Sequence, residues 1–133
     1  MAASFTSVMR ALVAASLLLA TAVVMFAVAN TARAAGALAV GSCGAFGEAF
    51  DFTNVAGARE SALSKCQGET CKVVTTVRRG CTAFAVDFAN PCGPNGWGRA
   101  SNLGTSQNAA LRSCYHDGGK ECVIRTFFCD AKG

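Results

Sequence analysis

The chain has 133 residues, with 12 basic and 8 acidic side chains, and its formal net charge at neutral pH is +4. This charge is small and the basic residues are scattered, which excludes the concentrated basic surface of a nucleic-acid-binding domain. Once the N-terminal segment is set aside, the remaining length suits one small domain and excludes two.

Residues 1–34 have the pattern of a secretory signal peptide. Arg10 precedes an apolar run over residues 11–29, and Ala32, Arg33 and Ala34 form a small-x-small cleavage site. We expect cleavage after Ala34, which leaves residues 35–133 as a single disulfide-rich domain. Because Arg10 and Arg33 are then lost, the net charge falls from +4 to +2. The alternative is an uncleaved membrane anchor, since the apolar run approaches the roughly 20 residues that a spanning helix needs.

The rest of the chain contains two internal repeats, at about residues 36–81 and 82–130. Each begins with a short apolar segment (36–40 and 82–86), followed by a loop with one cysteine and an aromatic-Gly-x-Ala motif (46–49 and 97–100). A segment of helical spacing then ends on Ala-Leu-x-x-Cys (62–66 and 110–114), and a β-rich run follows. This order predicts strand, loop, strand, helix and strand in each half.

The expected fold class is therefore α+β, as one small domain of two pseudo-symmetric β-β-α-β repeats stapled by disulfides. A mainly antiparallel sheet would carry the two helices on one face, with the other face solvated or covered by loops. Thr53 or Asn54 is the expected N-cap of the first helix, and Thr105 or Ser106 that of the second. Small residues on the buried side of each helix indicate close contact with the sheet.

All eight cysteines follow the predicted cleavage site. An even, dense set in a short exported chain indicates a disulfide framework. The absence of a Cys-x-x-Cys motif and the presence of a single histidine argue against a metal site, and no cofactor is expected. Two pairs flank short turns, and the other two are symmetry equivalents that could meet across a two-fold axis. The expected bridges are Cys66–Cys71, Cys114–Cys122, Cys81–Cys129 and Cys43–Cys92, although the sequence leaves other connectivities open.

The residues that could carry catalysis are few. His116 is the only histidine, and it could act with carboxylates such as Glu48 and Asp87 in a small hydrolase. A nucleophilic Cys114 would need a free thiolate, which the expected bridge removes. Exposed surface positions are the simpler interpretation of the histidine and the acids, so no catalytic residue is assigned.

A binding surface is the other hypothesis. The loop at residues 89–96 contains both prolines of the chain and a cysteine that would anchor it, and a rigid loop loses little entropy on binding. Trp and Arg are frequent interface anchors. The candidate residues are Asn90, Pro91, Pro94, Asn95, Trp97 and Arg99. The alternatives are that the loop is only a hairpin connection and that Trp97 belongs to the core.

The duplicated layout resembles a bacterial exported family called "domain of unknown function 4189". The most specific motifs are Ala-Leu-Ser-Lys-Cys at 62–66, Cys-Lys-Val-Val at 71–74 and Gly-Cys-Thr-Ala-Phe-Ala-Val at 80–86, with Trp97-Gly98 and Ala-Leu-Arg-Ser-Cys at 110–114. Cys43 and Cys92 are additions to the usual pattern of that family. The resemblance covers about residues 36–130 and implies export and a repeated, cysteine-stapled domain. It implies no activity and no catalytic residues.

Two functions from different classes follow. The first is a non-catalytic binding or inhibitor-type module in the periplasm or outside the cell, whose partner is another exported protein. Neither nucleic acid nor, after cleavage, a membrane is an expected partner. The second is the small carboxylate-dependent hydrolase.

Overall fold

The structure, a computed structural model, describes residues 2–29 and 34–130, and the chain divides into two compact units. The first unit contains helix α1 (Ala2–Ala29), whose side chains are exposed over residues 7–23. No helix within the described residues is both long enough and apolar enough to cross a membrane. Ala32 and Arg33 of the predicted cleavage site lie outside the described residues, as do residues 131–133 of the predicted domain.

The second unit has the element order that the repeats predict. Its strands are β1 (Ala35–Val40), β2 (Phe46–Phe52), β3 (Lys72–Val77), β4 (Gly80–Asp87), β5 (Asn95–Ala100) and β6 (Cys122–Asp130). Its helices are the short 3-10 helix η1 (Ser42–Gly44) and the α-helices α2 (Val55–Lys65) and α3 (Leu103–His116).

The helix starts are set by asparagine caps. The side chain of Asn54 accepts a hydrogen bond from Gly57 N at 2.8 Å, as predicted for α2. Helix α3 starts earlier than predicted, because Asn102 Oδ1 accepts from Thr105 N at 2.9 Å and satisfies an N–H that the first turn leaves unpaired.

The six strands form two antiparallel sheets of three strands, in the orders β2-β1-β3 and β5-β4-β6. The central strand of each sheet is the first strand of its half, so β1 corresponds to β4, β2 to β5 and β3 to β6. An irregularity interrupts the pairing at the same place in both sheets, after Leu38 in β1 and after Phe84 in β4. The extra residue is Val74 in β3 and Arg125 in β6.

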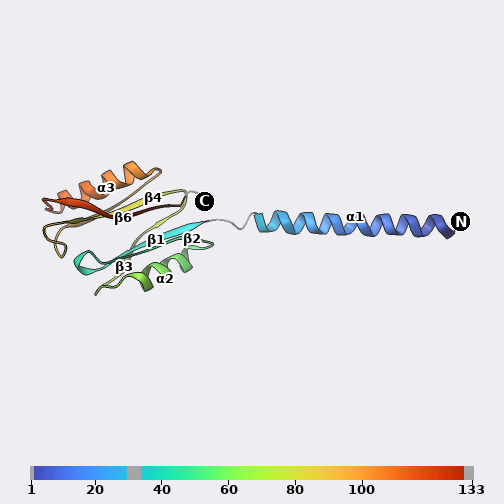
Figure 1. Cartoon of the computed structure of the whole chain (residues 1–133), viewed down its shortest axis with the longest axis horizontal. Helices are drawn as coiled ribbons and strands as arrows, with labels where there is room; N and C mark the ends of the chain where they lie inside the picture. Colours follow the sequence, from blue (N-terminus) through green and yellow to red (C-terminus); the bar gives the residue numbers. More distant parts are fainter. Residues whose placement is uncertain (1, 30–33, 131–133) are drawn as a thin grey trace. The chain divides into compact units, whose positions relative to one another are not determined.

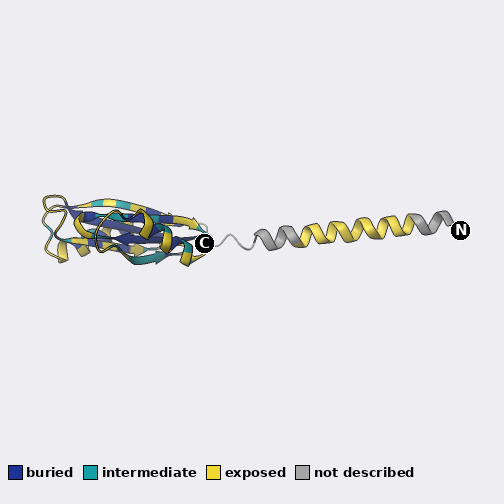
Figure 2. Cartoon of the chain, turned by 90° about the horizontal axis from the view of Figure 1, so that it is seen from below, coloured by how far each residue is buried: buried dark blue, intermediate teal, exposed yellow. Residues whose placement is uncertain are grey.

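The α+β class and the antiparallel pairing are confirmed, whereas the helices are placed differently from the prediction. Helix α2 packs on the first sheet and α3 on the second, and the two sheets face each other between the helices (Figure 1). The space between the sheets is filled by large apolar side chains such as Leu38, Phe84 and Phe128. One helix cannot cover a sheet whose two faces are both apolar, so the second face of each sheet is buried on the other sheet. Figure 2 shows the resulting burial along the strands.

The contacts between helix and sheet are made by small residues, as predicted. Ala37, Ala39 and Ala49 of the first sheet pack on Ala58 and Ala62 of α2, and the second sheet packs on α3 in the same way. The backbones approach so closely that a Cβ added at Gly47 would lie 2.0 Å from the carbonyl oxygen of Ala62.

Four disulfides join the residues expected to pair: Cys66–Cys71, Cys114–Cys122, Cys81–Cys129 and Cys43–Cys92. Three have the predicted relation to the repeats. The Cys81–Cys129 bridge does not join the two halves, because Cys81 begins the second half on β4 and lies directly opposite Cys129 on β6. It therefore links neighbouring strands of one sheet, and Cys43–Cys92 is the bridge between the halves.

Candidate functional site

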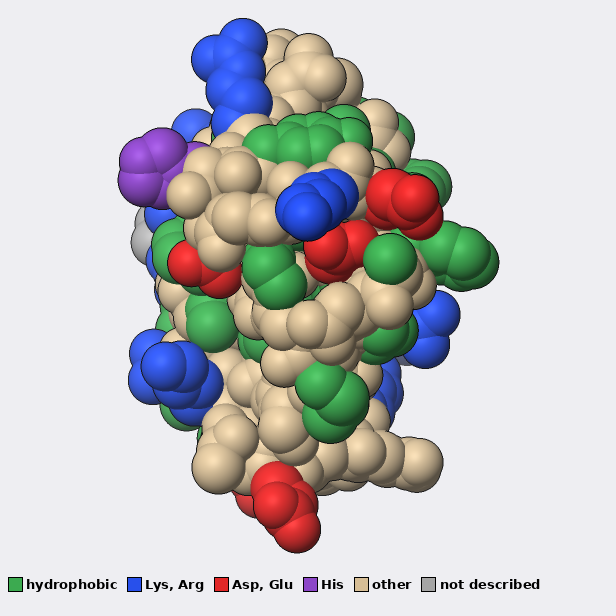
Figure 3. All heavy atoms as spheres, turned by 90° about the vertical axis from the view of Figure 1, so that its left-hand side faces the viewer, with side chains coloured by type: hydrophobic (Ala, Val, Ile, Leu, Met, Phe, Trp, Pro, Cys, Tyr) green, Lys and Arg blue, Asp and Glu red, His purple; other side chains and the backbone are tan. Residues whose placement is uncertain are grey.

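The loops after β1 and β4 lie together at one end of the domain, where the Cys43–Cys92 bridge joins them. Their bases are built alike: Gly41 N donates to Ala45 O at 2.9 Å in the first loop, and Asp87 N donates to Pro94 O at 3.0 Å in the second. The second loop has more residues between these two points, which include both prolines. Figure 3 views this end of the domain, where hydrophobic side chains reach the surface among charged ones.

The carboxylate of Asp87 fixes the second loop. Its two oxygens accept hydrogen bonds from Ala89 N and Lys120 N, both at 3.1 Å, and the side chain is almost completely buried. The N–H of Lys120, followed by other backbone N–H groups, holds the pKa of Asp87 below its usual value, although burial acts in the opposite direction. Asp87 thus ties the loop after β4 to the segment before β6.

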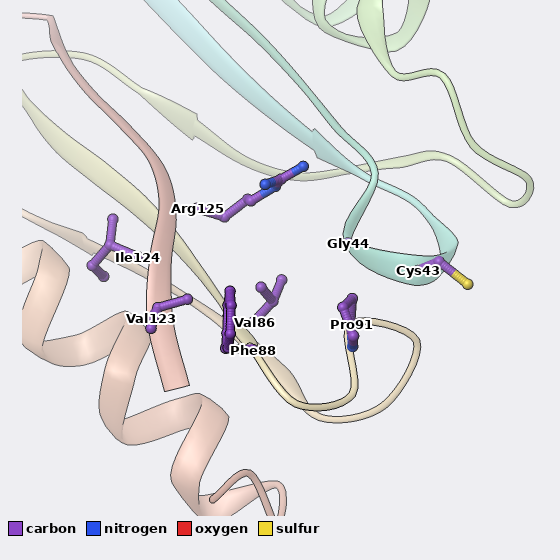
Figure 4. A pocket seen from close by; sticks show the side chains of 8 residues that line it. All are labelled: Cys43, Gly44, Val86, Phe88, Pro91, Val123, Ile124 and Arg125. Atoms are coloured by element: carbon purple, nitrogen blue, oxygen red, sulfur yellow. The ribbon is translucent and has the colours of Figure 1, made fainter. Parts of the chain in front are cut away.

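A pocket of about 330 Å³ opens beside this loop (Figure 4). Its lining residues are Cys43, Gly44, Val86, Phe88, Pro91, Val123, Ile124 and Arg125. Phe88 is 71% exposed, the largest exposed fraction among the large apolar side chains of the second unit that the structure describes, and Val123 is 41% exposed. Gly44 has a φ of +72°, and its backbone lies so close to Val86 that an added Cβ would be 3.3 Å from Val86 Cγ1. Helix η1 therefore forms one wall of the pocket.

The apolar surface extends beyond the point where the two sheets cover each other. Val86 and Phe88 point to the same side of their strand, and Val123 lies opposite Val86 on β6. We call Phe88, Val123 and Pro91 the apolar patch. Sheet pairing explains its direction, because the same side of β4 carries Phe84 into the core between the sheets.

Corresponding positions in the first half are occupied differently. Phe88 N donates to Glu121 O at 2.9 Å, and at the corresponding position Ser42 N donates to Glu69 O at 3.0 Å. The register likewise matches Val123 with Lys72. The first half thus has a serine and a lysine where the second half exposes phenylalanine and valine. The corresponding positions of the first half therefore carry polar side chains in the same backbone arrangement.

Arg125 also lines a second, more polar pocket of about 240 Å³. The residues that line the second pocket are Gly44, Ala45, Phe46, Lys65, Gln67 and Arg125. The Arg125 guanidinium lies over the Phe46 ring, with its carbon 5.9 Å from the ring centre. Lys65 Nζ donates to Glu48 O at 3.0 Å. Arg125 therefore lies next to the apolar patch, and Lys65 lies in the adjoining polar pocket.

The binding residues predicted from sequence lie in two places. Pro91 lines the apolar pocket, and Asn90, Pro94 and Asn95 belong to the same loop or its end. Trp97 and Arg99 lie further along β5 and do not line either pocket. Trp97 is 41% exposed, which favours a surface position over the core alternative.

Sequence reasoning missed Phe88, Val123 and Arg125. The one available signal was the alternation of Phe84, Val86 and Phe88, which runs past Asp87, the last residue of β4. Such an alternation predicts a strand, and nothing in it separates an exposed Phe88 from a core residue.

The three residues of the hydrolase hypothesis have separate surroundings. The Glu48 carboxylate accepts a hydrogen bond from the Thr126 hydroxyl between the sheets, while Asp87 is bonded to loop backbone and His116 is the exposed last residue of α3. Within residues 2–29 and 34–130, no hydrogen bond joins any two of these side chains. The described part of the chain contains no group of three His, Cys, Asp or Glu side chains that could hold a metal ion.

The comparison with protein families gives one result. The family model described as "Domain of unknown function (DUF4189)" matches residues 35–129, which is nearly all of the described part of the second unit. Neither a curated protein nor a solved structure matches the chain. Since the match covers most of the sequence, the chain belongs to the "Domain of unknown function (DUF4189)" family.

Proposed function

We propose that this protein is an exported, non-catalytic binding or inhibitor-type module, which holds a protein partner on the apolar patch. The observation that carries the proposal is that Phe88 is 71% exposed, whereas the corresponding position in the first half is occupied by Ser42. Exposed apolar surface with no structural purpose is typical of a binding site.

The surroundings of Phe88 favour binding energetically. Complete burial of a phenylalanine side chain contributes about 1.5–3 kcal/mol, and most of the Phe88 side chain is still available for burial. The Cys43–Cys92 bridge and the hydrogen bonds to Asp87 hold the loop in place before a partner arrives. Little conformational entropy is therefore lost on association.

Four disulfides support a location in the periplasm or outside the cell, because such bridges persist in oxidising compartments. The apolar run at residues 11–29 and the cleavage site after it support the same location. The proposed partner is accordingly another exported protein.

The test begins with a photo-crosslinking amino acid at position 88, with Leu63 on α2 as the matched exposed position. A partner that is captured at position 88 and not at position 63 is then purified, and its Kd for the mature domain is measured. Phe88→Ser, which introduces the residue of the first half, should weaken binding by at least about tenfold.

Phe127→Ser is the control, because Phe127 is half exposed on β6 and does not line the pocket. Phe127→Ser should leave the Kd within about threefold of the value for the unmodified domain. Both variants should melt at temperatures close to that of the unmodified domain. Equal binding by the Phe88 variant and the unmodified domain would reject the proposal.

A further inference from the structure

The two pockets adjoin, and they differ in chemistry. They share Gly44 and Arg125, so they meet at these two residues. The larger is lined by apolar side chains such as Val86 and Phe88, and the smaller contains Lys65 beside Arg125. We propose that together they bind an extended acidic peptide segment of the partner, with an apolar side chain in the larger pocket and a carboxylate at Arg125.

The charge of the site supports an acidic ligand. Arg125 is exposed and its guanidinium lies over the Phe46 ring, while Lys65 donates to a backbone carbonyl. In the part of the chain that the structure describes, neither cation forms an ion pair. The carboxylate of Glu48 is engaged by the Thr126 hydroxyl. A planar guanidinium in this position can bind a carboxylate through two parallel hydrogen bonds.

The corresponding position in the first half is again different. Val74 is the extra residue of β3, as Arg125 is of β6, and Val74 packs against the core between the sheets. The fold therefore accommodates an apolar residue at this irregularity. Arg125 replaces this apolar side chain with a charged one, which lies at the margin of the apolar patch.

The position of β6 favours a peptide as the acidic ligand over a fatty acid or a small organic acid. Strand β6 lies at the edge of its sheet, and among the strands of the described residues it pairs with β4 alone. Three consecutive residues of β6, from Val123 to Arg125, line the apolar pocket. An edge strand has backbone N–H and C=O groups that an extended peptide can pair with, while neighbouring pockets select its side chains.

This inference rests on the proposed function, and synthetic peptides can test the two separately. The probe is a blocked pentapeptide, acetyl-Ser-Leu-Ser-Glu-Ser-amide, in which leucine and glutamate are two residues apart and face one side. Binding to the mature domain is followed by NMR chemical shifts at low salt. Replacing glutamate by glutamine should weaken binding about threefold to fivefold, replacement by lysine should weaken it more, and replacing leucine by alanine should also weaken it.

The protein variants identify the residues responsible. Arg125→Gln should remove the difference between the glutamate and glutamine peptides, and Arg99→Gln, a matched change of an exposed arginine on β5, should preserve it. Phe88→Ser should weaken binding of both peptides. Amide hydrogen exchange along β6 should slow when the glutamate peptide is bound.

The outcomes separate the two proposals. If binding depends on Phe88 and is the same for glutamate and glutamine, the acidic preference is rejected and the binding module stands. Dodecanoate, a fatty acid with an apolar chain and a carboxylate, is the probe for a lipid ligand. If dodecanoate binds at the apolar patch and the peptide does not, the inference of a peptide ligand is rejected. Chemical shift changes that the peptide causes only at residues away from both pockets would contradict the inference. A captured partner that binds the Phe88→Ser variant as tightly as the unmodified domain would reject the proposed function itself.

Discussion

Gly47→Ala tests the close packing of α2 on the first sheet. An added Cβ would lie 2.0 Å from Ala62 O, 2.6 Å from Cys66 N and 3.0 Å from Lys65 C, all of them backbone atoms. Ordinary contact would require helix and strand to separate by about 1 Å or more. The helix end cannot move freely, because the Cys66–Cys71 bridge ties it to the start of β3.

Overpacking of this kind costs about 1–3 kcal/mol, and contact with backbone places Gly47→Ala at the upper end. For a domain of this size, about 3 kcal/mol corresponds to a decrease in melting temperature of roughly 12–24 °C. The control is Gly104→Ala at the start of α3, where an added Cβ meets only Asn102 Oδ1 at 3.8 Å. Alanine should stabilise that site by about 0.5–1 kcal/mol.

Thermal melts of the oxidised mature domain at neutral pH measure both effects. The two glycine substitutions should shift the melting temperature in opposite directions. A Gly47→Ala variant that melts within about 2 °C of the unmodified domain would show that α2 does not lie against β2 as described.

Three further predictions concern the bridges, the loop and the N-terminus. Replacing Cys43 and Cys92 together by serine should lower the free energy of unfolding by about 4 kcal/mol in the chain-entropy model, and replacing Cys66 and Cys71 by only about 2 kcal/mol, since their loop is shorter; equal losses in denaturant titrations would contradict this. The lowered pKa of Asp87 means that it contributes stability above its unfolded pKa, near 3.8, and that this contribution is lost as the pH falls through the lower folded value. Asp87→Asn should therefore lower the melting temperature most at pH 7, and a difference that does not shrink toward pH 3 would refute this role. Mass spectrometry of the exported protein should find a chain that starts at or near Ala35, whereas a chain that retains Met1 would oppose export with cleavage.

Much of the fold follows from local patterns. Helical spacing before Cys66 and Cys114, and the β-rich runs after them, predict the elements because each pattern reflects which side chains are buried. The positions of the cysteines beside short turns predict two of the bridges for the same local reason.

The division into two sheets has no comparable signal within a single element. Ala37 and Ala39 face α2, while Leu38 and Val40 face the other sheet, so β1 is buried on both sides. A strand that is apolar on both sides must be covered on both, which a single sheet with helices on one face does not provide. The partner that supplies the second cover is a long-range property of the fold.

The candidate site was predicted only in part, for a similar reason. The prolines and Cys92 mark a rigid loop locally, which placed Pro91 correctly on the surface. The exposure of Phe88 and Val123 depends on where the facing sheet ends, and the placement of Arg125 depends on an irregularity in strand pairing. Neither feature has a signal within a few residues of the side chains concerned.

We propose above that a partner binds at the end of the domain around Phe88. Hydrogen exchange of the mature domain, with and without the captured partner, tests it most directly because every backbone amide reports. We expect slower exchange at residues 88–93 and 122–126 and unchanged exchange in α2. Protection that is confined to α2, or to β5 around Trp97, would contradict it.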